Sequence, residues 1–225
     1  ISLGASVQVV TANAGTVLLS AGTTLTMAGS AMVTASGSSL RMTAGGNITV
    51  GNLVAASVSV VSATGDVTNA AGASLNMSAT SLRLVSAGSV GTPSRPLSLT
   101  VGEVSIVAGG AIYVSQSTAV TVGTTSVTVR EVLVDGTTVA RTDGSQAGLS
   151  SGNDGDIVLV VASGDLTVNS AVAADGSGNI LLTAQSGRVV ASADIGSGSG
   201  HVAVNASTVM LLNADVDVAT SQPGT

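Results

Sequence analysis

The sequence predicts an all-β chain that folds as a single-stranded parallel β-helix, or β-solenoid, with about three short strands in each coil. Three observations lead to this fold class: an internal repeat of 22–23 residues, short segments of alternating apolar and polar residues, and a scarcity of aromatic and charged side chains. The 225 residues include one Tyr and no Phe or Trp, and charged residues make up 8%, against roughly 25% in typical domains.

The first segment, residues 1–129, consists of apolar–polar–apolar triplets separated by Gly, Ala, Ser, Asn and Asp. Alternation with a period of two places the outer side chains of a triplet on one sheet face and the middle one on the other. The residues between triplets supply turns, and no helical stripe is present. The triplets are VQV (7–9), LTM (25–27), LRM (40–42), ITV (48–50), VSV (58–60), LNM (75–77), LRL (82–84), LSL (97–99), VSI (104–106), VTV (120–122) and VTV (127–129).

Two all-β architectures compete for such segments. An antiparallel sandwich or barrel needs hairpin signals and strands of roughly 5–6 residues, whereas a solenoid needs short strands, corners and one repeat per coil. In a solenoid each triplet stacks on its counterpart at about 4.8 Å, so about ten coils would give a rod on the order of 50 Å long. A narrow interior of constant width accepts aliphatic columns but not occasional rings, which favours the solenoid.

Residues 130–154 interrupt the rhythm and are expected to form an inserted loop or a small hairpin lying on the rod. The pair Asp135-Gly136 separates two apolar runs, which is a hairpin signal. Solenoids often carry function in such insertions, so its charged residues are a candidate ligand-contact site, and a plain corner loop is the alternative. The candidate residues are Arg130, Glu131, Asp135, Arg141 and Asp143.

Residues 155–225 carry the clearest repeat. The segment GDIVLVVASGDLTVNSAVAADGS is followed by the near copy GNILLTAQSGRVVASADIGSGSG, and a third, looser copy begins with GHVAVN. In this alignment Ile157, Ile180 and Val202 occupy one position and are expected to stack. Solenoid ends normally need polar capping elements, and we find none at Ile1 or Thr225. We therefore expect a segment of a longer rod, or one joined end to end with neighbours.

The outward-facing positions change character along the chain. Up to residue 129 they are mostly Gln, Thr, Arg, Ser and Asn, whereas in the last three coils several are aliphatic. Stacked along a rod, these would form apolar stripes on one or two faces. They are either scattered surface residues, which are common, or a lateral contact with a second rod or with the insertion. The residues are Val158, Val160, Leu181, Val190 and Leu211.

The distribution of charge argues against two classes of partner. Residues 1–141 hold five Arg and four acidic residues, a net charge of +1, and residues 142–225 hold one Arg and eight Asp, a net charge of −7. Neither part has the basic stripe of a nucleic-acid-binding protein. The longest apolar run is six residues, 157–162, which is too short for a membrane span. We expect no nucleic-acid partner and no membrane insertion.

Groups that could carry chemistry are sparse. Glycosidic cleavage uses two carboxyl groups about 5–10 Å apart, and the pairs Asp154/Asp156 and Asp215/Asp217 could meet this spacing, but solvated turn positions are the simpler interpretation. His201 has no Cys or second His to complete a metal site, and the stretch NDGD fits neither an EF-hand loop nor a calcium-binding repeat. We expect no enzymatic activity, no cofactor and no metal.

The stretch GSVGTPSRPLSLTVGEVSIVAGGAIYVSQSTAVTVG, which begins at Gly88, resembles the repeat region of filamentous-haemagglutinin-like bacterial surface proteins of the two-partner secretion type. The similar features are the GSVGT turn, Pro96-Leu97 at the start of a strand, AGGAIYVS with Tyr113, and the closing VTVG. The resemblance covers about 35 residues well and most of the chain loosely. It implies a right-handed parallel β-helix, export through an outer-membrane partner, and a cell-surface or secreted filament.

We therefore expect a structural rod segment of a bacterial cell-surface or secreted filament or giant adhesin, located outside the cell. Its partners would be itself or neighbouring solenoid segments, end to end or laterally, and a host or cell-surface glycan or protein. A ligand-binding adhesin module that uses residues 130–154 is the alternative, and a carbohydrate-active β-helical enzyme is a remote one.

Overall fold

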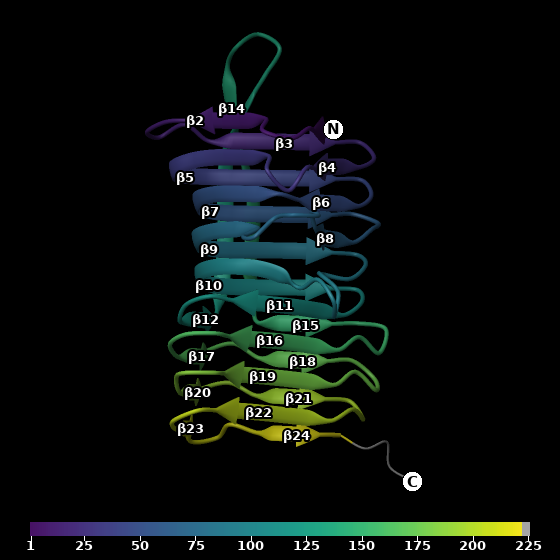
Figure 1. Cartoon of the computed structure of the whole chain (residues 1–225), viewed down its shortest axis with the longest axis vertical. Coiled ribbons are helices and arrows are strands. Elements are labelled where there is room, and N and C mark those ends of the chain that lie inside the picture. The colour runs from purple at the N-terminus through teal and green to yellow at the C-terminus, as the bar shows by residue number, and fades with distance from the viewer. Residues whose placement is uncertain (222–225) are drawn as a thin grey trace.

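The computed structural model describes residues 1–221 and confirms the all-β solenoid. Parallel strands stack in about ten turns, with about three strands in each coil, and the described part of the chain contains no helix. The N-terminus and the last described strand lie at opposite ends of the stack (Figure 1). Residues 222–225, the end of the third segment expected from the sequence, lie outside the described residues.

Three ladders of parallel strands run along the rod. The first ladder extends from one end to the other, and Val90 bridges β8 to β11 within it. Its strands are β1 (Ser2–Leu3), β4 (Leu25–Met27), β6 (Ile48–Val50), β8 (Val67–Asn69), β11 (Ile112–Gln116), β16 (Ile157–Val161), β19 (Ile180–Ala184) and β22 (Val202–Ala206).

In the first half of the chain, the second and third ladders share long bent strands. Each of these strands starts in the second ladder and turns a corner into the third. In the first of them the corner includes Gly37 at φ 68°, a conformation that glycine adopts without steric cost. The triplets LSL (97–99) and VSI (104–106), which the sequence suggests as separate strands, therefore lie in one continuous strand. The bent strands are β5 (Met32–Ala44), β7 (Asn52–Ser62), β9 (Met77–Ser86) and β10 (Leu97–Ala108).

The other coil strands belong to one ladder each. The second ladder also holds β2 (Gln8–Thr11), β12 (Val120–Val122), β17 (Leu166–Val168), β20 (Val189–Ala191) and β23 (Met210–Leu212). The third ladder also holds β3 (Val17–Ala21), β15 (Leu149–Ser151), β18 (Val172–Ala174), β21 (Ile195–Ser197) and β24 (Val218–Thr220). We call the outward side of the third ladder the hairpin face.

Inward side chains form continuous aliphatic columns, as the repeat predicts. Ile157, Ile180 and Val202 are successive register partners, and the first two are 0% and 1% exposed. Full burial of such a side chain contributes about 1.5–3 kcal/mol. The column runs through Leu25, Ile48, Val67, Val90, Ile112, Ile157, Ile180 and Val202.

An antiparallel hairpin leaves the coils between β12 and β15. It consists of β13 (Thr124–Val132) and β14 (Thr138–Ala147), joined by a turn in which Gly136 has φ 80°. Its bounds differ from the expected insertion, residues 130–154, because the hairpin starts at Thr124 and residues 149–154 belong to β15 and a coil turn. The alternation of the triplet 127–129 is the same as that of a coil strand, so the pattern does not reveal that this segment leaves the rod.

Candidate functional site: a hairpin docked on the coils

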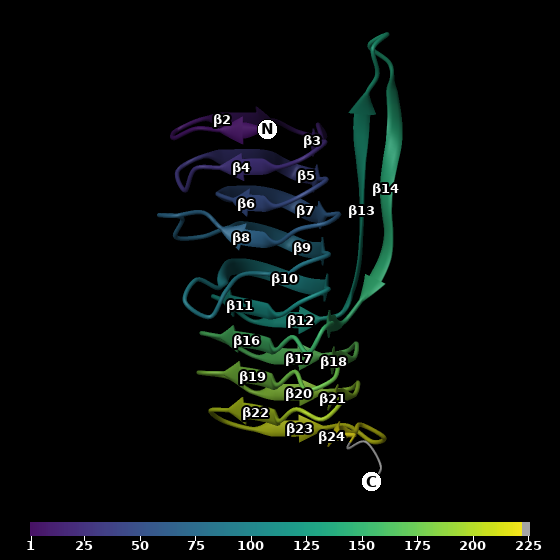
Figure 2. The same cartoon turned by 90° about the vertical axis from the view of Figure 1, so that its right-hand side faces the viewer.

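The hairpin lies along the rod axis and crosses the strands of the third ladder (Figure 2). Strand β13 contacts β3, β5, β7, β9 and β10. The tip extends beyond the coils at the N-terminal end of the chain (Figures 1 and 2). The hairpin and the face beneath it are the main departure from a plain solenoid in residues 1–221, and they form the candidate site.

One side of the hairpin faces the coils and the other faces solvent. Val127 and Val129 of β13 are 2% and 0% exposed, and the register partner of Val127 on β14 is Asp143. Directly opposite residues of an antiparallel pair lie on the same face, so Asp143 also faces the coils. On the solvent side, the hydroxyls of Thr128 and Thr142 are hydrogen-bonded to each other at 2.9 Å.

Asp143 is the centre of the polar contacts between the hairpin and the rod. Arg41 of β5 donates from Nε to Oδ2 at 2.8 Å and from Nη2 to Oδ1 at 2.9 Å, and Ser59 of β7 donates to Oδ2 at 2.6 Å. Burial alone would raise the pKa of Asp143, but the hydrogen bonds from Arg41 and Ser59 and the charges of Arg41 and Arg83 hold this pKa below its ordinary value. The ionised carboxylate is therefore the form that docks the hairpin.

Further hydrogen bonds secure the base of the hairpin. Arg83 Nε donates to the carbonyl of Gly144 at 3.0 Å, and the amide of Gln146 donates to the carbonyl of Leu84 at 3.0 Å. The hydroxyl of Thr125 is hydrogen-bonded to that of Ser105, and both residues are buried. The base is thus fixed to both β9 and β10.

The far end of the docked region is held at β3. The backbone N–H of Arg130 donates to the hydroxyl of Thr16 at 2.8 Å, immediately before β3 begins. Together with the contacts of Arg41, Ser59 and Arg83, this bond connects the hairpin to successive strands of one ladder. The hairpin therefore ties together coils that otherwise contact only their neighbours.

The structure brings two charged residues of the expected ligand-contact site, Glu131 and Arg141, to one shallow pocket of about 310 Å³ that Arg41 also lines. Asp143 lies under the hairpin against Arg41, and Arg141 pairs with Glu131 within the hairpin. Asp135 accepts bonds from the N–H and the hydroxyl of Thr137 in the turn, and these bonds lower its pKa. Arg130 is exposed. These charges mainly stabilise the hairpin and its attachment to the rod.

The sequence pattern does not indicate the coil side of this interface. The one available signal is that Arg41 and Arg83 stand in the middle of the triplets LRM and LRL, where the other triplets of the first segment have uncharged residues. Nothing local connects these two Arg residues to Asp143, because the first is 102 residues away from it.

The five aliphatic residues expected to form stripes lie on two ladders. Val158 and Leu181 are register partners in the first ladder, and Val160 follows on the same strand as Val158. Val190 and Leu211 are partners in the second ladder. Leu211 is 45% exposed and the other four are half-buried. They form two short apolar patches on different sides of the C-terminal coils.

Acidic and amide side chains at the starts of strands form hydrogen bonds from one coil to the next. Asp156 Oδ1 accepts the backbone N–H of Asn179 at 2.8 Å, and Asn179 Oδ1 accepts that of His201 at 2.9 Å. Asp165 accepts the N–H of Arg188 at 2.8 Å and also its guanidinium. A carboxylate that accepts such bonds satisfies backbone donors that lie outside the strand ladders.

The same bonds involve one of the acidic pairs considered as catalytic candidates, Asp154/Asp156, whereas in the pair Asp215/Asp217 they involve only the backbone N–H of Asp217. Asp154 accepts the N–H of Ser177 at 2.7 Å, and the N–H of Asp217 donates to Asp194 at 3.0 Å. Asp156 also accepts the hydroxyl of Tyr113 at 3.0 Å. Its pKa is lowered, chiefly by the N–H of Asn179. The signal in the sequence is the recurrence of Asp and Asn about 23 residues apart.

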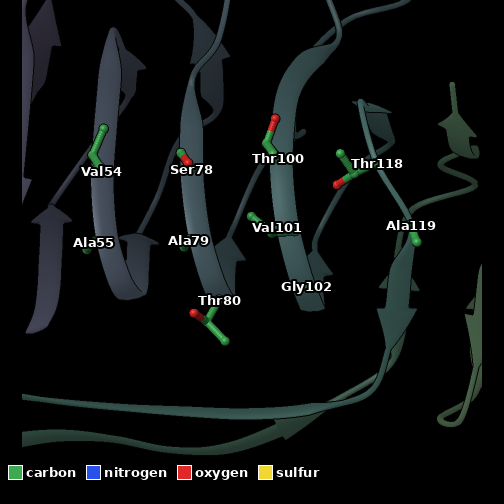
Figure 3. Close-up of a pocket in the computed structure, with 10 residues that line it drawn as sticks. All are labelled: Val54, Ala55, Ser78, Ala79, Thr80, Thr100, Val101, Gly102, Thr118 and Ala119. Carbon is green, nitrogen blue, oxygen red and sulfur yellow. The ribbon is translucent and has the colours of Figure 1, made fainter. Parts of the chain in front are cut away.

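An open groove of about 500 Å³ crosses β7, β9 and β10 next to the hairpin (Figure 3). Its lining consists of small aliphatic and hydroxyl side chains and carries no charged group: Val54, Ala55, Ser78, Ala79, Thr80, Thr100, Val101, Gly102, Thr118 and Ala119. Such a lining offers hydrogen bonds to a ligand but no general acid or base.

Within residues 1–221, no group of three or more His, Cys, Asp or Glu side chains is arranged to hold a metal ion. The same part of the chain has no helix of the length and hydrophobicity that a membrane crossing requires.

The chain was compared with known protein families, with characterised proteins and with solved structures. No family matches it, no characterised protein matches it, and no solved structure matches it. The structure itself shows a β-solenoid of about ten turns, which is compatible with a β-helical repeat protein.

Proposed function

We propose that this chain is a structural rod segment of a bacterial cell-surface or secreted filament or giant adhesin. The observation that carries the proposal is the continuous stack of parallel coils, braced on one face by a hairpin that connects β3 to β10. Aliphatic columns inside and backbone hydrogen bonds between coils give a stiff body from a simple repeat.

The chemistry of the described residues supports a building role over catalysis. Asp154, Asp156, Asp165 and Asp194 accept hydrogen bonds from the next coil, and the groove beside the hairpin has no charged lining. The resemblance of the stretch beginning at Gly88 to filamentous-haemagglutinin-like repeats points in the same direction, and it supports the proposal that the protein lies outside the cell. We therefore propose that the chain is not an enzyme.

Immunolabelling of intact bacteria tests the proposal. Antibodies raised against the purified chain are expected to label unpermeabilised cells of the source bacterium, or filaments shed from them, in electron micrographs. Labelling that appears only after permeabilisation would overturn the proposal, whatever the properties of the isolated chain.

A second candidate is a ligand-binding adhesin module that uses the hairpin. The observation in its favour is the exposed apolar tip, where Val132 is 70% exposed and Val134 is fully exposed. Arrays of glycans and host proteins would separate the two candidate functions. They would be probed with the intact chain and with a variant in which a short Gly-containing turn replaces the tip residues 131–139. Binding that is lost with the tip would favour the second candidate.

A further inference from the structure

The first ladder is interrupted between β8 and β11, where a short loop leaves it. Val90 bridges these two strands as a single residue, and the chain departs from the ladder at Gly91, which has φ 65°. A Cβ added at Gly91 would clash with the carbonyl oxygen of Tyr113, so glycine is required at this close approach. The loop that follows, residues 92–95, is exposed.

Two sets of hydrogen bonds hold this loop in one position. Within it, the backbone N–H groups of Thr92 and Arg95 donate to each other's carbonyls at 3.0 and 3.1 Å. At its end, the amide of Asn69 donates to the carbonyl of Pro96 at 2.9 Å, and the fully buried Asn76 donates to Asn69 Oδ1 at 3.0 Å. A satisfied polar network of this kind is rigid, so the root of the Arg95 side chain is fixed relative to the coils.

A pocket of about 340 Å³ lies between the loop and the outward side of the first ladder. The ladder contributes Thr49 and Thr68, which are register partners with hydroxyl oxygens 3.3 Å apart. Because the hairpin lies on the third ladder, this pocket is separate from the hairpin site. Its lining is Thr49, Thr68, Asn69, Ala71, Thr92 and Arg95.

Arg95 is the one charged residue in the lining of this pocket. Among residues 1–221 the ion pairs are formed by Arg41, Arg141 and Arg188, so the exposed guanidinium of Arg95 has no acidic partner there. A guanidinium presents a planar set of N–H donors that matches the two oxygens of a carboxylate. The neighbouring hydroxyls both donate and accept hydrogen bonds, as the hydroxyl groups of a sugar do.

We propose that this pocket binds a saccharide unit that carries a carboxylate, such as a uronic acid unit of an acidic glycan. Arg95 pairs with the carboxylate, and the hydroxyls of Thr49, Thr68 and Thr92 bind those of the sugar. A volume of about 340 Å³ is near the lower end for ligand pockets, which suits a single sugar unit. The inference goes beyond the proposed function, because it gives the rod a ligand site away from the hairpin.

The lining favours a sugar over an acidic peptide as the source of the carboxylate. Hydroxyl and amide groups surround Arg95, and Ala71 is the one aliphatic residue among them. The side chains next to an acidic residue of a peptide would therefore find little apolar surface to bury. Sugar hydroxyls, in contrast, would exchange their bonds with water for bonds with Thr and Asn side chains.

NMR titrations of the 225-residue chain with four small probes test the inference. The probes are methyl glucuronide, the neutral methyl glucoside, acetate, and glucose 6-sulfate. We expect the glucuronide to shift the Nε signal of Arg95 and the methyl signals of Thr49 and Thr68. The glucoside and acetate should each bind at least about tenfold more weakly, because one lacks the carboxylate and the other lacks the sugar. Glucose 6-sulfate should also bind more weakly than the glucuronide.

Three variants locate the binding on the pocket. Arg95→Gln removes the charge and should raise the dissociation constant of the glucuronide at least about tenfold. Thr68→Val removes a hydroxyl from an outward strand position, so it should weaken glucuronide binding and leave acetate binding unchanged. Arg130→Gln, at an exposed position of the hairpin, is the matched control and should leave the affinity for the glucuronide unchanged. Urea unfolding of each variant checks that the coils are intact.

Several results would overturn the inference. The first is a titration in which the glucuronide leaves the pocket signals in place, or shifts the signals of all Arg residues equally. The second is an Arg95→Gln variant with the affinity of wild type. The third is a glucoside, acetate or glucose 6-sulfate that binds as tightly as the glucuronide. None of these bears on the proposed surface location, because immunolabelling of cells decides that separately.

Discussion

Arg41 and Asp143, 102 residues apart in the chain, form a two-point ion pair that fixes the hairpin to the solenoid. Their side chains are 22% and 11% exposed, and the carboxylate takes a third hydrogen bond from Ser59. A solenoid coil contacts only the coils on either side of it. This pair therefore provides a constraint that the repeat itself cannot supply.

Replacing Asp143 by Ala should undock the hairpin and leave the coils folded. The substitution removes three hydrogen bonds to a charged group and leaves Arg41 without its partner, which we expect to cost about 1.5–3 kcal/mol of docking free energy. Native-state hydrogen exchange should show the amides of Val127 and Val129 exchanging roughly 10- to 100-fold faster, with Ile157 unchanged. Asp175→Ala, at an exposed turn, is the control, and equal protection in both variants would contradict the prediction.

Docking of the hairpin should depend on acid pH through Asp143. Its pKa is lowered in the folded chain, so the stabilisation is fully present above the unfolded value of about 3.9 and is lost as the pH falls through the folded value. We expect the methyl NMR signals of Val127 and Val129 to shift towards undocked positions below about pH 4. The Asp143→Ala variant should show no such transition, and a wild-type transition at neutral pH would exclude this carboxylate as the cause.

Asp156 should matter for stability because it accepts hydrogen bonds, and its charge should matter less. Asp156→Ala leaves the N–H of Asn179 and the hydroxyl of Tyr113 without their acceptor, at a cost of about 1–3 kcal/mol. Asp156→Asn keeps one acceptor oxygen and should recover most of the loss. Urea unfolding midpoints measure both variants, and an Asn variant as unstable as the Ala variant would show that the charge is the dominant contribution.

Side-by-side assembly should be sensitive to the patch that contains Leu181. This residue lies between Val158 and Ala203 in the first ladder, so Leu181→Asp places an unpaired charge in an apolar column. We expect fewer lateral bundles in sedimentation and electron microscopy. Thr49→Asp, at a polar column of the same ladder, should have a smaller effect, and equal behaviour of the two variants would count against a lateral role for the patch.

The repeat in the sequence defines the C-terminal coils almost completely, because each inward residue has a counterpart about 23 residues away. The alignment of Ile157 with Ile180 and Val202 is the register observed between strands. The bent strands of the first half are less evident in the sequence. A corner such as the one at Gly37 interrupts the alternation of apolar and polar residues, although the strand continues through it from the second ladder into the third. The hairpin site is least evident, because a long-range ion pair has no local pattern.

The width of the interior should limit the size of core side chains more strictly than in an ordinary domain. Val67 is fully buried and stacks between Ile48 and Val90. Val67→Phe adds a ring to a column whose walls are fixed by backbone hydrogen bonds on both sides, so overpacking should cost about 1–3 kcal/mol or more. Val10→Phe, at a position of β2 that is 60% exposed, should be nearly neutral. Chemical unfolding of both variants measures the difference, and a Val67→Phe chain as stable as wild type would mean that bore width does not explain why the chain avoids aromatic residues.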